Sequence, residues 1–454
     1  MKSINPVNNQ VIREYPEHSA AEVIAVLESV QAEWLKWKLT SFAERRSLLR
    51  NAAVILREKK RQWASLITLE MGKIIRESEA EVEKCATVCD FYAENGEAFL
   101  KDSVIASDAS RSFVAYQPLG VVLAVMPWNF PFWQVFRFAA PALMAGNAAV
   151  LKHASNVPGC ALAVEEIFRE AGFPADLFRT LMIPSSQVEA VIAHPVIRAV
   201  TLTGSEQAGS QVAAAAGKNI KKTVLELGGS DPFIVLEDAD LEHAISVAVT
   251  ARMINQGQSC IAAKRFIVTE KVKPAFESGL QKVFEGLIMG DPMDPVTQVG
   301  PLARPDLVNA IERQVEDSVK AGATLLCGGK RPTREGCYYL PTILTDVTSS
   351  MPVFREETFG PVAVIISVKS EEEAIALAND GEFGLGGSVW TRDIARGERV
   401  ARDIETGAMF VNGLVKSDPR LPFGGIRKSG YGRELGETGI REFVNAKTIW
   451  ISEK

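Results

Sequence analysis

The stretch AVTLTGSEQAG, residues 199–209, decides the predicted fold. A short apolar run ends at Thr203, and Gly204, Ser205 and Gly209 then open a helix. Small residues at such a turn leave backbone N–H groups accessible at the positive end of the helix, where a pyrophosphate binds well. A plain strand-to-helix turn uses the same residue types, so a binding site and a simple turn both remain open for this segment. The chain has no GxGxxG sequence, so any dinucleotide must be held in another way.

The same alternation of apolar runs and helical stretches extends in both directions from this segment. Strand-like runs occupy residues 121–127, 148–153, 199–204, 233–236, 265–270, 361–368, 387–391 and 408–413, and two helical stretches at 20–38 and 42–71 precede them. Such alternation is typical of βαβ units and parallel sheets. The sequence therefore predicts two α/β domains in series that join near Gly228-Gly229, with residues 442–451 as a strand that leaves the second domain.

Composition narrows the classes of partner. The 454 residues carry 50 Lys and Arg against 56 Asp and Glu, a net charge of −6, and no long basic block, which argues against nucleic acid and anionic membranes. Residues 112–136 are uncharged over a length that could span a bilayer, but three prolines interrupt them. Six cysteines are too few for a disulfide framework, and the start of the chain has no apolar signal segment. We therefore expect a cytoplasmic enzyme that acts on a small substrate.

Common catalytic templates are missing from the sequence. The four histidines form no HExxH pair and lie near no CxxC, so no metal site is expected. Neither a GxSxG elbow nor a Walker A loop is present.

Three other segments carry residue types suited to catalysis. NQGQSC (255–260) presents the thiol of Cys260 beside amides and a glycine, although a lone cysteine is more often a small buried residue. In VLELGGSDP (224–232), Glu226 ends an apolar strand, where burial would raise its pKa as a general base requires; a solvated carboxylate is the alternative. In MPWNFPFWQVFR (126–137), Asn129 lies between an aromatic residue and two prolines. The prolines fix the backbone, so the side-chain amide of Asn129 can point in one direction towards a ligand; the alternative is an ordinary turn asparagine.

Taken together and in this order, the motifs resemble those of the NAD(P)-dependent aldehyde dehydrogenase superfamily over essentially the whole chain. The matching segments are INP (4–6), PWNFP (127–131), LKHAS (151–155), LTGS (202–205), ELGG (226–229), NQGQSC (255–260), EETFGPV (356–362) and PFGGIRKSGYGRE (422–434). The resemblance implies an α/β fold with two Rossmann-type parallel-sheet domains and a β-flap for oligomerisation. It places the dinucleotide-binding domain at 1–111 and 126–228, the catalytic domain at 229–436, and the flap at 112–125 and 437–454.

The resemblance also implies a mechanism. Cys260 would add to the aldehyde, and Asn129 and the Cys260 backbone N–H would hold the oxyanion of the thiohemiacetal. After hydride transfer, Glu226 would activate the water that hydrolyses the thioester. The residues that match the family's cofactor contacts are Trp128, Lys152, Ser155, Gly204, Ser205, Glu357 and Phe359.

Ser155 bears on the choice of cofactor. Members that prefer NAD usually have a glutamate at this position, and a carboxylate about 4 Å from a 2′-phosphate would be repelled by up to roughly 4 kcal/mol per charge pair at an effective dielectric constant of 20. Serine removes this repulsion, and Lys152 adds a positive charge. We therefore predict a preference for NADP; the alternative is that Ser155 merely relaxes the selectivity and NAD is used as well.

The substrate is predicted from Arg137, Trp133 and Ser417. Succinate-semialdehyde dehydrogenases of the superfamily have an arginine at the position of Arg137 and a serine at that of Ser417, and both contact the substrate carboxylate. Trp133 would pack against the methylene chain of the substrate or, alternatively, in the protein core. A second arginine of that group is Ile254 here, and its redox-switch cysteine is Ala262. We expect oxidation of succinate semialdehyde to succinate, with a broad aliphatic aldehyde or another semialdehyde as the alternative, Arg137 then forming a structural salt bridge. A non-catalytic scaffold is the alternative outside enzymes.

Residues 112–119 and 441–450 are predicted to pair as strands of the flap. Exposed strand edges of this kind are normally covered by another chain. The expected assembly is a homodimer or homotetramer.

Overall fold

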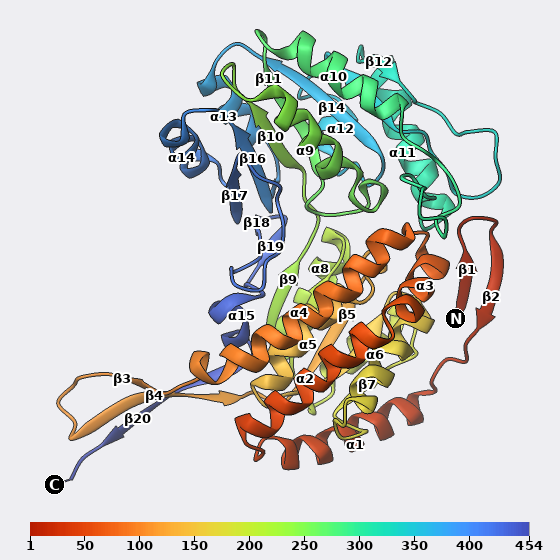
Figure 1. The fold of residues 1–454 in the computed structure, drawn as a ribbon. Coiled ribbons are helices and arrows are strands. Elements are labelled where there is room, and N and C mark those ends of the chain that lie inside the picture. Colours follow the sequence, from red (N-terminus) through yellow and green to blue (C-terminus); the bar gives the residue numbers. More distant parts are fainter. Residues whose placement is uncertain (454) are drawn as a thin grey trace.

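The computed structural model describes residues 1–453 and has two α/β domains, one above the other in Figure 1, with a β-arm that projects from the lower one. The lower domain holds a six-stranded sheet in the order β19-β9-β8-β5-β6-β7. Five of its strands are parallel, namely β5 (Val121–Met126), β6 (Ala148–His153), β7 (Phe178–Thr180), β8 (Ile197–Thr203) and β9 (Lys222–Glu226). The sixth, β19 (Gly430–Tyr431), returns from near the end of the chain and pairs antiparallel with β9.

Helices cover both faces of this sheet. Those between the strands are α5 (Trp133–Met144), α6 (Pro158–Glu170), α7 (Val188–Ala193) and α8 (Glu206–Lys218). Helix α1 (Ala20–Trp37) packs on β6, whereas α2 (Phe42–Glu58), α3 (Lys60–Met71) and α4 (Ile75–Phe99) pack on α5 and α6. The predicted helix over 42–71 is therefore wrong in one respect, because the chain leaves helical geometry at Lys59 (φ −102°, ψ 19°). A short hairpin, β1 (Lys2–Asn5) and β2 (Gln10–Glu14), precedes them.

The upper domain holds a seven-stranded sheet in the order β12-β13-β14-β11-β10-β16-β17, parallel except for β12. The strands are β10 (Asp231–Val235), β11 (Ala263–Thr269), β12 (Thr324–Cys327), β13 (Thr342–Thr345), β14 (Val362–Val368), β16 (Gly386–Trp390) and β17 (Ala408–Val411). Neighbouring residues of one strand enter opposite cores: Phe233 packs with α9 (Leu241–Met253) and α10 (Lys273–Glu285), and Ile234 packs on the other face with α11 (Pro305–Lys320) and α14 (Ile394–Asp403). The predicted arrangement of two parallel-sheet domains is confirmed.

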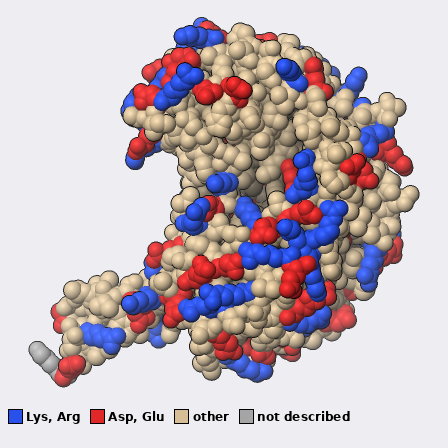
Figure 2. Space-filling model, viewed as in Figure 1, with Lys and Arg blue, Asp and Glu red and all other residues tan. Residues whose placement is uncertain are grey.

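The two sheets meet where β9 ends and β10 begins, at the predicted turn around Gly228-Gly229. A side chain on Gly229 would place its Cβ 2.6 Å from the carbonyl oxygen of Cys260, so this position requires glycine for close approach of the two backbones. Figure 2 shows this side of the molecule hollowed between the domains, and basic and acidic side chains are mixed over the lower one.

The β-arm consists of β3 (Ser103–Val104), β4 (Arg111–Pro118) and β20 (Val444–Ile451), and β4 and β20 pair antiparallel along their whole length. The predicted pairing of 112–119 with 441–450 is confirmed. The predicted flap of 112–125 is too long, since β5 is a central, buried strand of the lower sheet. The uncharged run of sequence continues from β4 into β5. Only Pro118 and Gly120, which has φ 138°, mark the boundary between the two strands. Among residues 1–453, no helix has the length and apolar character needed to cross a bilayer.

Candidate active site

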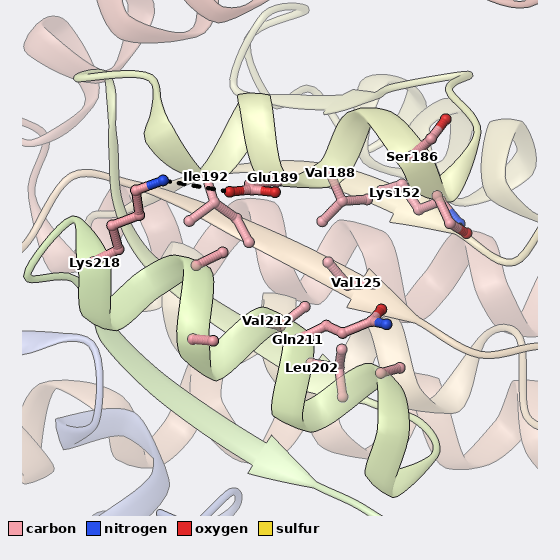
Figure 3. Close-up of a pocket in the computed structure, with 14 residues that line it drawn as sticks. Val125, Lys152, Ser186, Val188, Glu189, Ile192, Leu202, Gln211, Val212 and Lys218 are labelled. Carbon is pink, nitrogen blue, oxygen red and sulfur yellow. Dashed lines mark hydrogen bonds and ion pairs between the residues drawn. The ribbon is translucent and has the colours of Figure 1, made fainter.

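A cavity of about 540 Å³ lies between α7 and α8, at the carboxyl ends of β5, β6 and β8. Figure 3 shows apolar side chains of both helices, such as Ile192 and Val212, facing each other across it. At one end Lys218 forms an ion pair with Glu189 (3.8 Å), and Lys152 lies at the other end beside Ser186. A slot with apolar walls and a basic end matches the shape and charge of a nucleotide.

Lys152 and Ser155 come from the end of β6 and the turn after it. Lys152 Nζ donates a hydrogen bond to Ser185 Oγ (3.2 Å), and burial lowers the pKa of its ammonium. Ser185 also lines an adjoining cavity of about 460 Å³ together with Ser155. The two predicted residues therefore lie around one serine, where they can hold a ribose hydroxyl or a phosphate.

A second cavity, of about 260 Å³, contains most of the predicted site. Asn129 and Cys260 line it, as do the predicted cofactor residues Trp128, Gly204, Ser205, Glu357 and Phe359. It begins at the turn where β8 passes into α8, where Ser205 caps the helix by accepting the backbone N–H of Ala208 (3.3 Å). The structure thus brings these residues together from four separate motifs.

Two buried basic side chains, those of Lys264 and Arg252, fix the loop that contains Cys260 by donating hydrogen bonds to its backbone carbonyl oxygens. Lys264 Nζ donates to the carbonyl oxygens of Ser259 (2.9 Å), Cys260 (2.9 Å) and Ala262 (3.1 Å). Asn255 and Gln256 adopt left-handed backbone angles (φ 50° and 54°) directly before the loop, and Arg252 donates to Gly257 O (2.8 Å). Non-glycine residues in this conformation cost free energy that the surrounding contacts must offset.

Cys260 is half-buried, and its surroundings favour the neutral thiol over the thiolate. Burial raises the pKa of the thiol to about 12, and the nearby charges of Arg137 and Lys264 only partly oppose this rise. In the predicted role of Cys260 as nucleophile, a base would have to remove this proton.

The side chain of Asn129 has a fixed orientation. Its Oδ1 accepts from Gln134 Nε2 (3.1 Å), and its Nδ2 donates to Gln258 O (3.0 Å). The amide nitrogen therefore faces the loop that contains Cys260, and within residues 1–453 its second proton has no acceptor. An oriented amide at this place suits an oxyanion hole.

Glu226 lies at the end of β9, buried, with neither carboxylate oxygen in a hydrogen bond within residues 1–453. Burial, followed by the charge of Glu434, raises its pKa well above the ordinary carboxyl value, whereas Arg137 and Arg433 act in the opposite direction. Glu434 itself forms an ion pair with Arg137. Glu434 belongs to the PFGGIRKSGYGRE segment, but the sequence offered no sign of this pairing.

The predicted substrate residues line none of these three cavities. Arg137 is buried on α5, bound to Glu434 and to Thr203 Oγ1 (3.3 Å), so the structural salt bridge left open by the sequence is present. Trp133 Nε1 donates to Ser417 Oγ (3.1 Å), and both residues are buried. Trp133 and Ser417 therefore form one cluster. It lies at the start of α5, one helical turn before Arg137.

Comparison with known proteins agrees with this geometry. Residues 1–449 match the model of the Aldehyde dehydrogenase family. The chain is 57% identical over 450 residues to a "Probable succinate-semialdehyde dehydrogenase [NADP(+)]" of Synechocystis sp., covering 99% of each chain, and 49% identical over 453 residues to a "Succinate-semialdehyde dehydrogenase [NADP(+)]" of Mycolicibacterium paratuberculosis, covering 99% of this chain and 96% of that one. The crystal structure of succinic semialdehyde dehydrogenase from Streptococcus pyogenes in complex with NADP+ superposes with a TM-score of 0.98 at 41% identity, over 100% of both chains. The predicted resemblance is thus confirmed, and the chain belongs to the aldehyde dehydrogenase family.

Proposed function

We propose that this enzyme oxidises succinate semialdehyde to succinate with NADP+ as its cofactor. The observation that carries the proposal is the cavity in which Cys260 and Asn129 meet the turn at Gly204-Ser205, beside a nucleotide-shaped slot. The names of the relatives, at 49% and 57% identity over nearly the whole chain, supply the substrate and the cofactor.

The side chains support a thioester mechanism. Glu226 accepts the thiol proton as Cys260 Sγ bonds to the aldehyde carbon, and Asn129 Nδ2 and the Cys260 N–H hold the resulting oxyanion. When bound, NADP+ supplies the hydride acceptor that turns the thiohemiacetal into a thioester. Glu226 then releases the thiol proton to solvent, and its carboxylate takes a proton from a water molecule as the water oxygen bonds to the acyl carbon. The carbon–sulfur bond breaks, and the departing thiolate takes the proton from Glu226, which gives the acid and the free thiol.

The proposal assigns cofactor selectivity to Ser155. In Ser155→Glu we expect kcat/KM for NADP to fall about 100-fold relative to that for NAD, because a carboxylate beside Lys152 repels the 2′-phosphate. Steady-state kinetics with each cofactor measures the ratio, and Ser155→Ala is the control that changes the side chain without adding charge. A wild-type enzyme that uses NAD at least as efficiently as NADP would contradict the assignment.

The substrate is tested by comparing succinate semialdehyde with butanal, which has the same number of carbons and no carboxylate. We expect kcat/KM to be higher for succinate semialdehyde by about 100-fold or more, equivalent to about 2.7 kcal/mol. The ion pair of Arg137 with Glu434 favours a second candidate, a general aliphatic aldehyde dehydrogenase, since it occupies the arginine. Equal values for the two aldehydes would establish that second function and leave the chemistry intact.

We also propose a homodimer or homotetramer in the cytoplasm. Strand β20 is the outer strand of the arm, and most of its residues are exposed, so a second copy can cover it. Sedimentation of a monomer at micromolar concentration would refute the assembly.

A further inference from the structure

A lysine that the sequence did not single out lies beside two predicted substrate residues. Lys84, on α4, donates from Nζ to Ser417 Oγ (2.8 Å). The same ammonium lies 4.1 Å from the centre of the Trp133 ring, over its face. Lys84, Trp133 and Ser417 therefore form one polar cluster, built from three segments far apart in the chain.

The hydroxyl of Ser417 is arranged to donate. Its oxygen already accepts from Lys84 Nζ and from Trp133 Nε1 (3.1 Å), which occupies both lone pairs. Its own proton has no acceptor within residues 1–453, although the residue is only 4% exposed. A buried hydroxyl proton normally has an acceptor, so the acceptor for Ser417 must come from a bound molecule.

The charge of Lys84 is also unmatched. No carboxylate of residues 1–453 forms an ion pair with it, and the nearest acids are engaged elsewhere: Glu81 pairs with Lys73 and accepts the N–H of Trp133, and Asp418 pairs with Arg420. Burial and the neighbouring charge of Arg137 lower the pKa of Lys84 to about 8. A largely desolvated ammonium without a counter-ion is costly unless an anion joins it.

Arg137 differs from Lys84 in this respect. Its guanidinium is already neutralised by Glu434 and also donates to Thr203. Of the two cations near the cluster, Lys84 is thus the one whose charge is left for a ligand.

We propose that Lys84, with the hydroxyl of Ser417 as second donor, binds the carboxylate of the aldehyde substrate and determines specificity for it. This inference rests on the proposed function and names the residue that reads the substrate's charge. Trp133 orients both donors from the side, through its Nε1 and its ring.

The test replaces Lys84 by methionine, which keeps the length and apolar stem of the side chain, and by arginine, which keeps the charge. In Lys84→Met we expect the ratio of kcat/KM for succinate semialdehyde to that for butanal to fall about 30-fold, mainly through KM for the semialdehyde. Lys84→Arg should restore most of the ratio. Lys101→Met is the control, because Lys101 is exposed just beyond the end of α4.

A binding readout separates recognition from structure. Succinate should inhibit butanal oxidation by the wild-type enzyme, and its inhibition constant should rise by a similar factor in Lys84→Met. An unchanged ratio and inhibition constant in Lys84→Met, with a wild-type preference for the semialdehyde, would overturn the role of Lys84 and leave the proposed function standing. Equal losses for both aldehydes would assign Lys84 a structural role and overturn the inference, and a wild-type enzyme without preference would refute both proposals.

Discussion

Replacement of Cys260 by alanine is expected to lower kcat for aldehyde oxidation by about 10⁴-fold or more, since removal of a nucleophile abolishes the covalent route. The cavity around the residue is formed by other side chains, so the folded structure and cofactor binding should persist. Steady-state turnover with saturating aldehyde measures the first effect. Quenching of tryptophan fluorescence by NADP measures the second.

Cys327→Ala is the matched control, because its thiol is also half-buried but lies on β12, away from the cavity. Its activity should equal that of the wild type. Acid quenching during turnover should trap an acyl group on Cys260 in the wild type and in Cys327→Ala only. Turnover by Cys260→Ala within tenfold of the wild type would exclude the thioester route.

Glu226→Gln is expected to lower kcat by about 10²- to 10⁴-fold, the range typical for loss of a general base. The side chains have nearly the same shape, and neither oxygen of Glu226 accepts a hydrogen bond within residues 1–453, so the substitution leaves the packing intact. The loss therefore reports the proton transfer itself.

The pH dependence follows from the direction of the shift. Burial and Glu434 raise the pKa of Glu226, so the inactive acid form persists to higher pH than for an ordinary carboxyl group. Activity should rise as the pH increases through this raised pKa. This limb of the profile of kcat between about pH 5 and 9 should disappear in Glu226→Gln, which does not titrate. Glu382→Gln, which replaces an exposed carboxylate, is the control and should retain the rise of kcat with pH. If kcat of Glu226→Gln shows the same pH dependence as the wild type, the general base is another group.

The fold is most predictable from the sequence where the signal is local. Apolar runs between turn residues locate most strands of both sheets, because a parallel strand is buried on both faces, as the whole of β6 is. The short strands β7, β12 and β13 were not among those predicted. The motif residues around Cys260 are likewise visible in the sequence, since each lies at the end of a strand or in a tight loop, and the structure places several of them around one cavity. The end of the flap was missed because β4 and β5 form one uncharged run.

Contacts between distant segments could not be predicted. Arg137 has the same side chain whether it faces a substrate or Glu434, and only the fold brings β19 and its neighbours to α5. Lys84 gave no signal at all, because a single lysine in an amphipathic helix is ordinarily a solvated surface residue. The role proposed for it depends on its half-buried position beside Trp133 and Ser417, which no spacing in the sequence encodes.

The return of β19 to the lower sheet has a consequence for the order in which the protein can be completed. All parallel strands of that sheet leave the ribosome by residue 226, yet the free edge of β9 receives its partner only when residues 430–431 have been made. The edge of β4 waits longer still, for residues 444–451. During synthesis of the entire upper domain, the lower domain therefore exposes two unpaired strand edges, and these are the surfaces at which a nascent chain is most open to chaperones or to aggregation.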